Sequence, residues 1–323
     1  MPDGSDNLAI DTHGLSKSYK EVAALRSLDL KVARHSIFGF LGPNGAGKTT
    51  TIKLLLGLTR PTAGSGSVFG KDIASESVEI RGKTGYLAQN PRYYEYMTAR
   101  ETLRFRARFF YKGPKNLIED RIAETLDLVG LSDKADRPIK GFSGGELQRL
   151  GIAQAQVNYP DLLILDEPAA NLDPQGRRDV LEVMERLRAY TTIFYSTHIL
   201  DDVQQVSDTV AILNHGQLIA QESLDTLLAG SDGAVYTMMI KGDASLAQAE
   251  IAGQEWVSGM DVDIENGQTQ WQVRVVDEEA AEAQLLRLVL ADEGLVVTEF
   301  GRKKYELEEI FIGLIEGGKD GDY

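Results

Sequence analysis

The fold of this chain follows from the stretch Gly42-Pro43-Asn44-Gly45-Ala46-Gly47-Lys48-Thr49-Thr50. The apolar run 37–41 precedes it and the largely apolar run 51–56 follows it, a pattern typical of strand, tight loop and helix. Its three glycines let successive backbone N–H groups turn inward around an anion, because a Cβ there would crowd a phosphate or forbid the backbone angles. The spacing is that of a Walker A motif and predicts a phosphate-binding loop.

The residues of this loop divide into those with a specific role and those that shape the phosphate cradle. Lys48 would reach the β and γ phosphates of a nucleotide, and the Thr49 hydroxyl would bind Mg²⁺. The positive end of the helix that begins near Lys48 adds to the attraction for an anion. The remaining candidate nucleotide contacts are Gly42, Pro43, Asn44, Gly45, Ala46, Gly47 and Thr50.

A second apolar run, 162–165, ends in two acids, Asp166 and Glu167. It has the character of a buried parallel strand, and carboxylates at the end of such a strand are rarely without a function, since burying an unpaired one is costly. Asp166 suits the Mg²⁺ shell, directly or through water. Glu167 points differently and can orient or deprotonate the water that attacks the γ phosphate.

Two further polar residues follow predicted strands: Gln89 after 85–88 and His198 after 192–197. Such positions face the usual ligand crevice of an open α/β sheet. Gln89 could equally belong to a surface turn, and a lone histidine is more often structural, although the strand-end position favours a γ-phosphate contact for His198. Tyr19 could stack on an adenine ring or be an ordinary packing aromatic.

A second glycine motif, Ser143-Gly144-Gly145-Glu146, leads into a helix predicted over 150–156. By the argument used for the first loop, it predicts a second anion site at a helix N-terminus. A helix cap alone would explain Ser143 but not both glycines. Further along, Asp173 and Pro174 precede a helix predicted over 175–189.

Composition sets the broad class. The chain has 323 residues, enough for two domains, and no cysteine, so disulfides and thiolate metal sites are excluded. Its net charge of −15 argues against a general affinity for nucleic acid. No stretch approaches the roughly 18 consecutive apolar residues of a membrane-spanning helix. We expect the chain to be soluble, or attached to a membrane only through a partner.

Residues 92–142 change character and predict helices over 98–111 and 116–129. Arginines alternate with aromatic residues between Arg92 and Lys112, a pattern that can bind single-stranded nucleic acid. Leu103, Ala107 and Phe110 fall on one helical face, so an amphipathic helix with a basic outer face explains much of the pattern. Docking of another protein is the third interpretation.

These residues together resemble the nucleotide-binding subunit of ABC transporters over residues 8–228. The resemblance identifies 42–49 as Walker A, Gln89 as the Q-loop glutamine at the metal and reaction centre, and Tyr19 as the adenine-stacking aromatic. It further identifies 143–149 as the signature motif, 162–167 as Walker B with its catalytic glutamate, Asp173 as the D-loop aspartate and His198 as the switch histidine. It implies an Mg²⁺-dependent ATPase with the P-loop NTPase fold: a parallel core sheet, an antiparallel N-terminal β region and a helical subdomain over about 92–155.

The resemblance also implies partners. Two subunits, a homodimer or two paralogues, pair head to tail, so that Ser143, Gly144, Gly145 and Glu146 of one complete the ATP site of the other. A separate membrane permease docks near 86–112, which places the chain at the cytoplasmic face of the membrane. No nucleic acid partner is expected.

Residues 230–316 form a separate predicted domain that follows the cassette of residues 1–229. The region 230–323 holds 20 Asp or Glu against 7 Lys or Arg, so it carries −13 of the net charge of −15. Predicted strands over 235–240, 261–265, 270–276 and 295–300, with helices over 244–252 and 278–291, follow a ferredoxin-like α+β order. A last helix is predicted over 306–316 and a disordered tail over 317–323.

This extension resembles the C-terminal domain of ATPases of drug, antibiotic and polysaccharide exporters, which implies export. The alternative is a soluble ABC ATPase that acts on nucleic acid or ribosomes. Such proteins usually carry two cassettes, or a long coiled coil before the signature motif, and neither feature is present in this sequence.

Overall fold

The computed structural model describes residues 7–229, 234–265, 268–292, 294–303 and 307–317. The described residues form two compact units. The first extends to Leu224 and includes the chain again from Leu314, and the second covers Asp225–Gly313. None of the described helices is long and apolar enough to cross a membrane.

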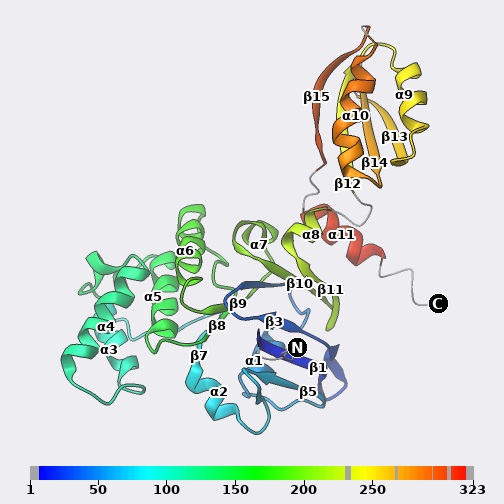
Figure 1. The fold of residues 1–323 in the computed structure, drawn as a ribbon. Coiled ribbons are helices and arrows are strands. Elements are labelled where there is room, and N and C mark those ends of the chain that lie inside the picture. Colours follow the sequence, from blue (N-terminus) through cyan, green and yellow to red (C-terminus); the bar gives the residue numbers. More distant parts are fainter. Residues whose placement is uncertain (1–6, 230–233, 266–267, 293, 304–306, 318–323) are drawn as a thin grey trace. The chain divides into compact units, whose positions relative to one another are not determined.

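A six-stranded sheet is the centre of the first unit (Figure 1). Its order is β11-β10-β4-β9-β8-β7, and all neighbours are parallel except the edge pair β10 and β11. The strands are β4 (Ile37–Leu41), β7 (Thr84–Leu87), β8 (Leu162–Asp166), β9 (Thr192–Thr197), β10 (Thr209–Asn214) and β11 (Gln217–Ser223). Strands β4, β8 and β9 are buried along their whole length, as expected for parallel strands covered on both faces. The predicted parallel core is confirmed.

A second sheet, antiparallel as predicted, is built from the N-terminal strands. These strands are β1 (Leu8–Tyr19), β2 (Val22–Leu28), β3 (Lys31–Ala33), β5 (Ala63–Val68) and β6 (Lys71–Asp72). The composition of residues 61–66, Pro-Thr-Ala-Gly-Ser-Gly, predicts a turn, but this prediction is wrong from Ala63 onward, because β5 begins there and pairs with β1. Gly64, with φ of 74°, lies where the pairing register shifts, so glycine serves an irregular strand here and not a turn.

One apolar core joins the two sheets through the helix after the phosphate loop, α1 (Lys48–Leu55). Phe194 of β9 is central to it, with its ring 5.7 Å from Phe38 and 5.2 Å from Phe40, both on β4. Ile52 and Leu54 of α1 are fully buried in the same core. Because α1, β4 and β9 share this core, their packing fixes the position of α1 relative to these two strands.

The other helices of the first unit are mostly gathered at one side of the central sheet (Figure 1). They are α2 (Ser77–Lys83), α3 (Ala99–Ala107), α4 (Lys115–Leu128), α5 (Gly144–Gln156), α6 (Pro174–Leu187) and α7 (Leu200–Val206), with short 3-10 turns at Ser132–Lys134 and Ile139–Gly141. The next helix, α8 (Leu224–Ala229), belongs to the second unit from Asp225 onward. Helix α3 ends before the predicted residue 111. The N–H groups of Phe110 and Tyr111 both donate to Ala107 O, which closes the helix as a turn.

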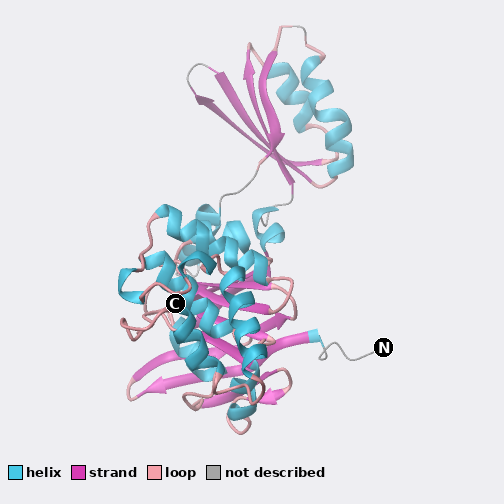
Figure 2. Cartoon of the chain, turned by 90° about the vertical axis from the view of Figure 1, so that its left-hand side faces the viewer, coloured by secondary structure: helices cyan, strands magenta, loops and turns pink. Residues whose placement is uncertain are grey.

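The second unit has the predicted ferredoxin-like order of strands and helices. Its elements are β12 (Ala234–Lys241), α9 (Ser245–Ala252), β13 (Val257–Glu265), β14 (Gln268–Val275), α10 (Glu278–Leu290) and β15 (Val296–Arg302). The antiparallel sheet has the order β13-β14-β12-β15, and both helices cover one of its faces (Figure 2). Trp271 of β14 is fully buried beneath them.

The division between the units falls at Leu224, before the predicted limit at residue 229. The last helix, α11 (Leu307–Gly317), is also divided, since residues from Leu314 belong with the first unit. Gly317, predicted to begin the tail, ends this helix. The stretch Gly-Ser-Asp-Gly at 230–233 has the composition of a linker, and the Asn-Gly pair at 266–267 predicts a hairpin turn. Both lie outside the described residues, as do residues 318–323 of the predicted tail.

Candidate nucleotide site

The phosphate loop connects β4 to α1 and depends on glycine for two physical reasons. Gly45 and Gly47 have φ of 84° and 111°, a region that side chains disfavour. A Cβ on Gly47 would also lie 2.6 Å from Ala24 O, and one on Gly42 would lie 2.3 Å from Leu213 O. The loop can therefore keep this shape only with glycine at these positions.

A cavity of about 230 Å³ opens over this loop. Its lining residues come from the loop and from three other segments: Ala24, Pro43, Asn44, Gly45, Gly47, Lys48, Thr49, Thr50, Gln89 and Glu167. The fold thus brings Gln89 and Glu167 to the loop from different strand ends. Gly42 and Ala46 are buried behind the surface of the loop and do not line the cavity.

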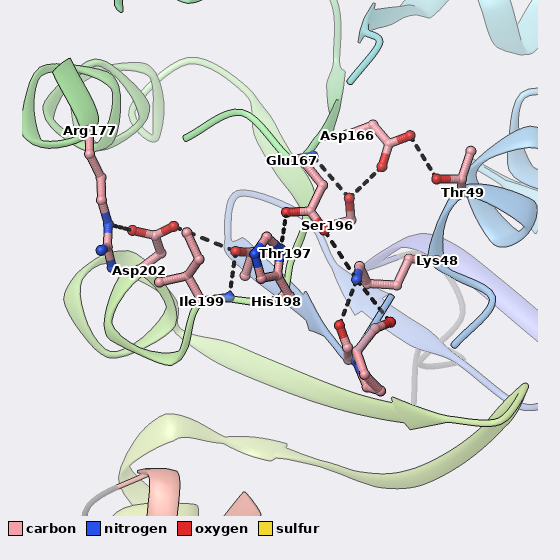
Figure 3. Close-up of polar contacts among 12 residues, drawn as sticks. Lys48, Thr49, Asp166, Glu167, Arg177, Ser196, Thr197, His198, Ile199 and Asp202 are labelled. Carbon is pink, nitrogen blue, oxygen red and sulfur yellow. Dashed lines mark hydrogen bonds and ion pairs between the residues drawn. The ribbon is translucent and has the colours of Figure 1, made fainter. Parts of the chain in front are cut away.

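Lys48 is buried and lies between backbone carbonyls and a carboxylate (Figure 3). Its Nζ donates to Gly42 O at 2.6 Å and to Pro43 O at 3.3 Å, and it lies 3.1 Å from Glu167 Oε1. A buried ammonium requires such partners, since an uncompensated charge in the interior is costly. The two carbonyls and the Glu167 carboxylate supply these partners and hold the Lys48 ammonium at the loop.

Asp166 is fixed at the end of β8 by two hydroxyl groups (Figure 3). Thr49 Oγ1 donates to its Oδ2 at 3.0 Å, and Ser196 Oγ donates to its Oδ1 at 2.6 Å. The same carboxylate charge, together with burial as the larger cause, raises the pKa of Tyr86. The role of Ser196 was not evident from the sequence, because Ser196 is one of four residues with a hydroxyl group in the six-residue strand β9, Thr-Ile-Phe-Tyr-Ser-Thr.

Glu167 adopts a left-handed backbone conformation with φ of 52°, which costs about 1–3 kcal/mol at a non-glycine residue. Its N–H donates to Ser196 O at 3.1 Å and to Ser196 Oγ at 3.0 Å. This conformation turns its carboxylate toward Lys48 on one side and His198 on the other, where Nδ1 lies 2.8 Å from Oε2. Because of this strained backbone conformation, the side chains of the consecutive residues Asp166 and Glu167 point in different directions.

The residues present fit a Mg²⁺ ion bound together with a phosphate. Mg²⁺ prefers oxygen ligands and usually takes only one or two from protein side chains, with phosphate and water oxygens as the rest. The Thr49 hydroxyl, which lines the cavity, and the Asp166 carboxylate directly behind it are such ligands. Asp166 and His198 do not line the cavity themselves but contact the lining residues Thr49 and Glu167. Among the described residues there is no group of three or more acidic, histidine or cysteine side chains that could hold a metal ion by itself.

The structure does not bring the remaining predicted residues to the cavity. Tyr19 ends β1, is 45% exposed and has Lys17 Nζ 5.0 Å from its ring centroid. Asp173 caps α6 by accepting from Gly176 N at 2.7 Å. Neither of these residues lines the cavity.

The second glycine motif begins α5 with a capping box. Glu146 N donates to Ser143 Oγ at 3.3 Å, and Ser143 N donates to Glu146 Oε2 at 2.9 Å. A Cβ on Gly145 would lie 2.9 Å from Gly176 Cα, so this glycine also allows α5 and α6 to pack closely. This packing role was not evident from the sequence, and it accounts for one of the two glycines that a cap alone would not explain.

Comparison with known proteins agrees with this geometry. A sequence profile described as "ABC transporter" matches residues 25–170. An uncharacterised ABC transporter ATP-binding protein of Bacillus subtilis is 34% identical over 306 residues, which cover 95% of this chain and 99% of that protein. The daunorubicin/doxorubicin resistance ATP-binding protein of Streptomyces peucetius is 35% identical over 309 residues, which cover 95% of this chain and 92% of that protein.

Among solved structures, cbiO1 from Clostridium perfringens, part of the ABC transporter complex cbiONQ, aligns with a TM-score of 0.65 and 26% identity. The alignment covers 69% of this chain and 92% of that one. Nothing in these comparisons supports the alternative of an ATPase that acts on nucleic acid or ribosomes.

Proposed function

We propose that this chain, which belongs to the ABC transporter family as an ATP-binding subunit, hydrolyses Mg²⁺-ATP at the loop 42–50 to drive a separate permease. The family hydrolyses ATP, and the residues responsible in this chain form our proposal. The observation that carries it is the gathering of Lys48, Asp166, Glu167 and His198 around one loop within hydrogen-bonding distance of one another or of a shared partner.

Each residue then has a role set by its contacts. Binding of ATP moves Lys48 Nζ from Glu167 to the β and γ phosphates, while the loop N–H groups bind the phosphate oxygens. Glu167, released from Lys48, accepts a proton from the attacking water. His198 contacts both the γ phosphate and the Glu167 carboxylate and so fixes their relative positions. A Mg²⁺ ion bound by Thr49 and Asp166, with Gln89 beside it, would supply positive charge against the β and γ phosphates.

The residues outside the cavity act in a dimer under this proposal. One cassette already surrounds the phosphates with its own loop, so the N-terminus of α5, with Ser143, Gly144, Gly145 and Glu146, is available to a nucleotide held by a second copy or a paralogue. Asp173 would lie at the same interface, and Tyr19 would stack on the adenine from the β1 end. Turnover is then efficient only in the dimer.

The test of this mechanism compares two substitutions that affect the Lys48–Glu167 pair in opposite ways. Glu167→Gln removes the competitor for Lys48 and one negative charge near the γ phosphate, so ATP is expected to bind at least as tightly as to wild type. Hydrolysis is expected to fall on the order of 10²–10⁴-fold through loss of the base, with accumulation of a closed dimer. Lys48→Ala is expected to lose ATP affinity instead.

The measurements are binding of a fluorescent ATP analogue, phosphate release and oligomeric state by light scattering. Glu182→Gln on the exposed side of α6 is the matched control and should change none of them. Wild-type turnover by Glu167→Gln would show that Glu167 is not the base.

The permease docks, we propose, on the aromatic and basic surface around α3. A cavity of about 450 Å³ lies there beside Tyr86, lined also by Arg92, Tyr93, Tyr94, Met97, Thr102, Phe105, Arg106, Phe109 and Gln154. Tyr94, Phe105 and Phe109 are exposed and meet edge to face, an arrangement typical of interface anchors. Because the cavity reaches β7, which ends two residues before Gln89, a docked segment would act directly on the nucleotide site.

We propose further that transport is export and that the chain is peripheral at the cytoplasmic face of the membrane. The Streptomyces peucetius relative is a drug resistance protein, and resistance by transport requires export, which supports this direction. A photo-reactive side chain at Phe109 is expected to cross-link to an integral membrane protein in host membranes. The same group at Tyr190, an exposed aromatic next to α6, is the control and should not.

A further inference from the structure

A buried carboxylate lies close to the nucleotide site without taking part in it. Asp202 of α7 is 1% exposed and does not line the cavity over the phosphate loop. Its Oδ1 accepts a hydrogen bond from Arg177 Nε, and its Oδ2 accepts one from Thr197 Oγ1 at 3.5 Å (Figure 3). The proposed mechanism assigns no role to Asp202 or to Arg177.

The contacts of Asp202 lead to the backbone on both sides of His198. Thr197, the residue before it, donates its hydroxyl to Asp202 and accepts the N–H of Ile199, the residue after it, at 3.0 Å. The His198 peptide is thus part of a closed turn that ends on the Asp202 carboxylate. The imidazole of His198, which this turn carries, lies with its Nδ1 2.8 Å from Glu167 Oε2.

Arg177 connects the same turn to α6. It lies one helical turn after the cap, and its own N–H donates to Asp173 O at 2.9 Å. Its guanidinium contacts Asp202 and lies 3.6 Å from Asp201 Oδ2. One side chain therefore links the helix that begins at Asp173 to the turn that carries His198.

The charge on Asp202 depends on this arginine. Burial raises the pKa of Asp202, and the hydrogen bond and charge of Arg177 oppose that effect, while Asp201 adds to it. The Tyr195 hydroxyl contacts the Asp202 backbone oxygen and Ser207 Oγ and is not itself a counter-ion. Removing Arg177 would leave a buried carboxylate with no cation, so the turn would rearrange or Asp202 would take up a proton.

We propose that Arg177 and Asp202 are positioning residues that hold the His198 turn against the start of α6, so that His198 is oriented for turnover only when this helix is in place. The inference rests on the role given to His198 in the proposed function. According to this inference, the position of α6, which begins at its cap Asp173, determines the orientation of the His198 side chain.

The test is steady-state ATPase of the purified full chain with Arg177→Gln, Asp202→Asn and the double variant. Each is expected to lower kcat on the order of 10- to 100-fold, the effect of misplacing a reacting group by about 1 Å, with the KM for ATP within about threefold of wild type. The double variant should be no worse than the worse single variant, because the two side chains act as one unit. Arg177→Lys keeps the cation and should recover part of kcat.

Arg178→Gln is the matched control, since Arg178 is the next residue on α6, is exposed and has no ion pair among the described residues. It should retain wild-type kcat. A general loss of structure would lower ATP affinity and the circular dichroism signal together, and would not be relieved by Arg177→Lys; that pattern overturns the inference, as does wild-type kcat in Arg177→Gln.

His198→Ala separates this inference from the function on which it rests. If His198→Ala loses turnover while Arg177→Gln and Asp202→Asn keep it, only the positioning role is wrong. If His198→Ala turns over at the wild-type rate, the role proposed for His198 is wrong and the positioning role falls with it.

Discussion

Replacing Ser196 by alanine is expected to weaken both the stability of the first unit and its use of Mg²⁺. Ser196 is fully buried, and its hydroxyl donates to Asp166 Oδ1 while accepting the N–H of Glu167. The substitution removes one oxygen atom without adding volume, so its effect reports on these two hydrogen bonds.

The loss of unfolding free energy depends on which hydrogen bonds remain to Asp166 and to the N–H of Glu167 after the substitution. Asp166 is 2% exposed, so water does not replace the lost donor, and a hydrogen bond to a charged group contributes about 1.5–3 kcal/mol. The N–H of Glu167 still donates to Ser196 O at 3.1 Å, so losing its second acceptor, the Ser196 hydroxyl, costs little. We expect unfolding to require about 2–3 kcal/mol less free energy, a fall in Tm of roughly 5–10 °C for a unit of this size.

The assay has to follow the first unit alone. Both tryptophans, Trp256 and Trp271, belong to the second unit, so the unfolding transition of the first is followed by circular dichroism after the tryptophan transition has been assigned. In the ATPase assay, the Mg²⁺ concentration at half-maximal rate should rise about 10- to 100-fold, as when a hydrogen-bond partner of a metal ligand is removed.

Ser207→Ala is the matched control, because it removes a buried hydroxyl whose partner among the described residues is the neutral Tyr195 hydroxyl at 2.7 Å. It should lose about 1 kcal/mol and leave the Mg²⁺ dependence unchanged. If Ser196→Ala were as stable as wild type within about 0.5 kcal/mol and needed no more Mg²⁺, Asp166 would not depend on the Ser196 hydroxyl and the reasoning would be refuted.

Three further substitutions test other parts of the structure. Gly47→Ala is expected to cost more than about 2 kcal/mol and to abolish binding of a fluorescent ATP analogue, because φ is 111° and the new Cβ would meet Ala24 O. Burial alone would raise the pKa of Glu146, but Lys134 and a backbone N–H outweigh it and hold the pKa below its usual range. The charge therefore stabilises the fold above the ordinary glutamate pKa and ceases to do so as pH falls through the lowered value, so urea titrations of wild type and Glu146→Gln should differ by about 1 kcal/mol at neutral pH and converge in acid. Trp271→Ala should destabilise the second unit by about 3–5 kcal/mol without changing ATP binding.

Controls accompany these three. Gly70→Ala, at φ of 73° but with no atom within 4 Å of the new Cβ, isolates backbone strain from steric overlap and should leave ATP binding intact. Glu101→Gln alters the equivalent position of the other capping box, at the exposed start of α3, and should show less pH dependence than Glu146→Gln. The remaining Trp256 reports unfolding of the second unit in Trp271→Ala. Equal effects of a variant and its control would contradict the reasoning in each case.

The elements of the fold and the phosphate loop could be predicted because their causes are local. Glycine at 45 and 47 reflects backbone angles that belong to single residues, and the apolar run before Asp166 reflects burial of one strand on both faces. The β5 strand was partly missed for the converse reason. Its glycines and serines have turn propensity, and only pairing with β1 supplies the hydrogen bonds that make Ala63–Gly66 a strand.

The amino-acid sequence alone reveals a phosphate loop, two acids at a strand end and a second glycine motif. Which of them meet is a property of the folded chain. In the parallel pair of β8 and β9, Asp166 lies beside Ser196, and a shift of one residue would turn the Ser196 hydroxyl to the opposite face of the sheet. That register, with the left-handed backbone of Glu167, creates the contacts of Lys48 and His198, and it depends on the packing of the whole sheet and not on any local pattern of residues.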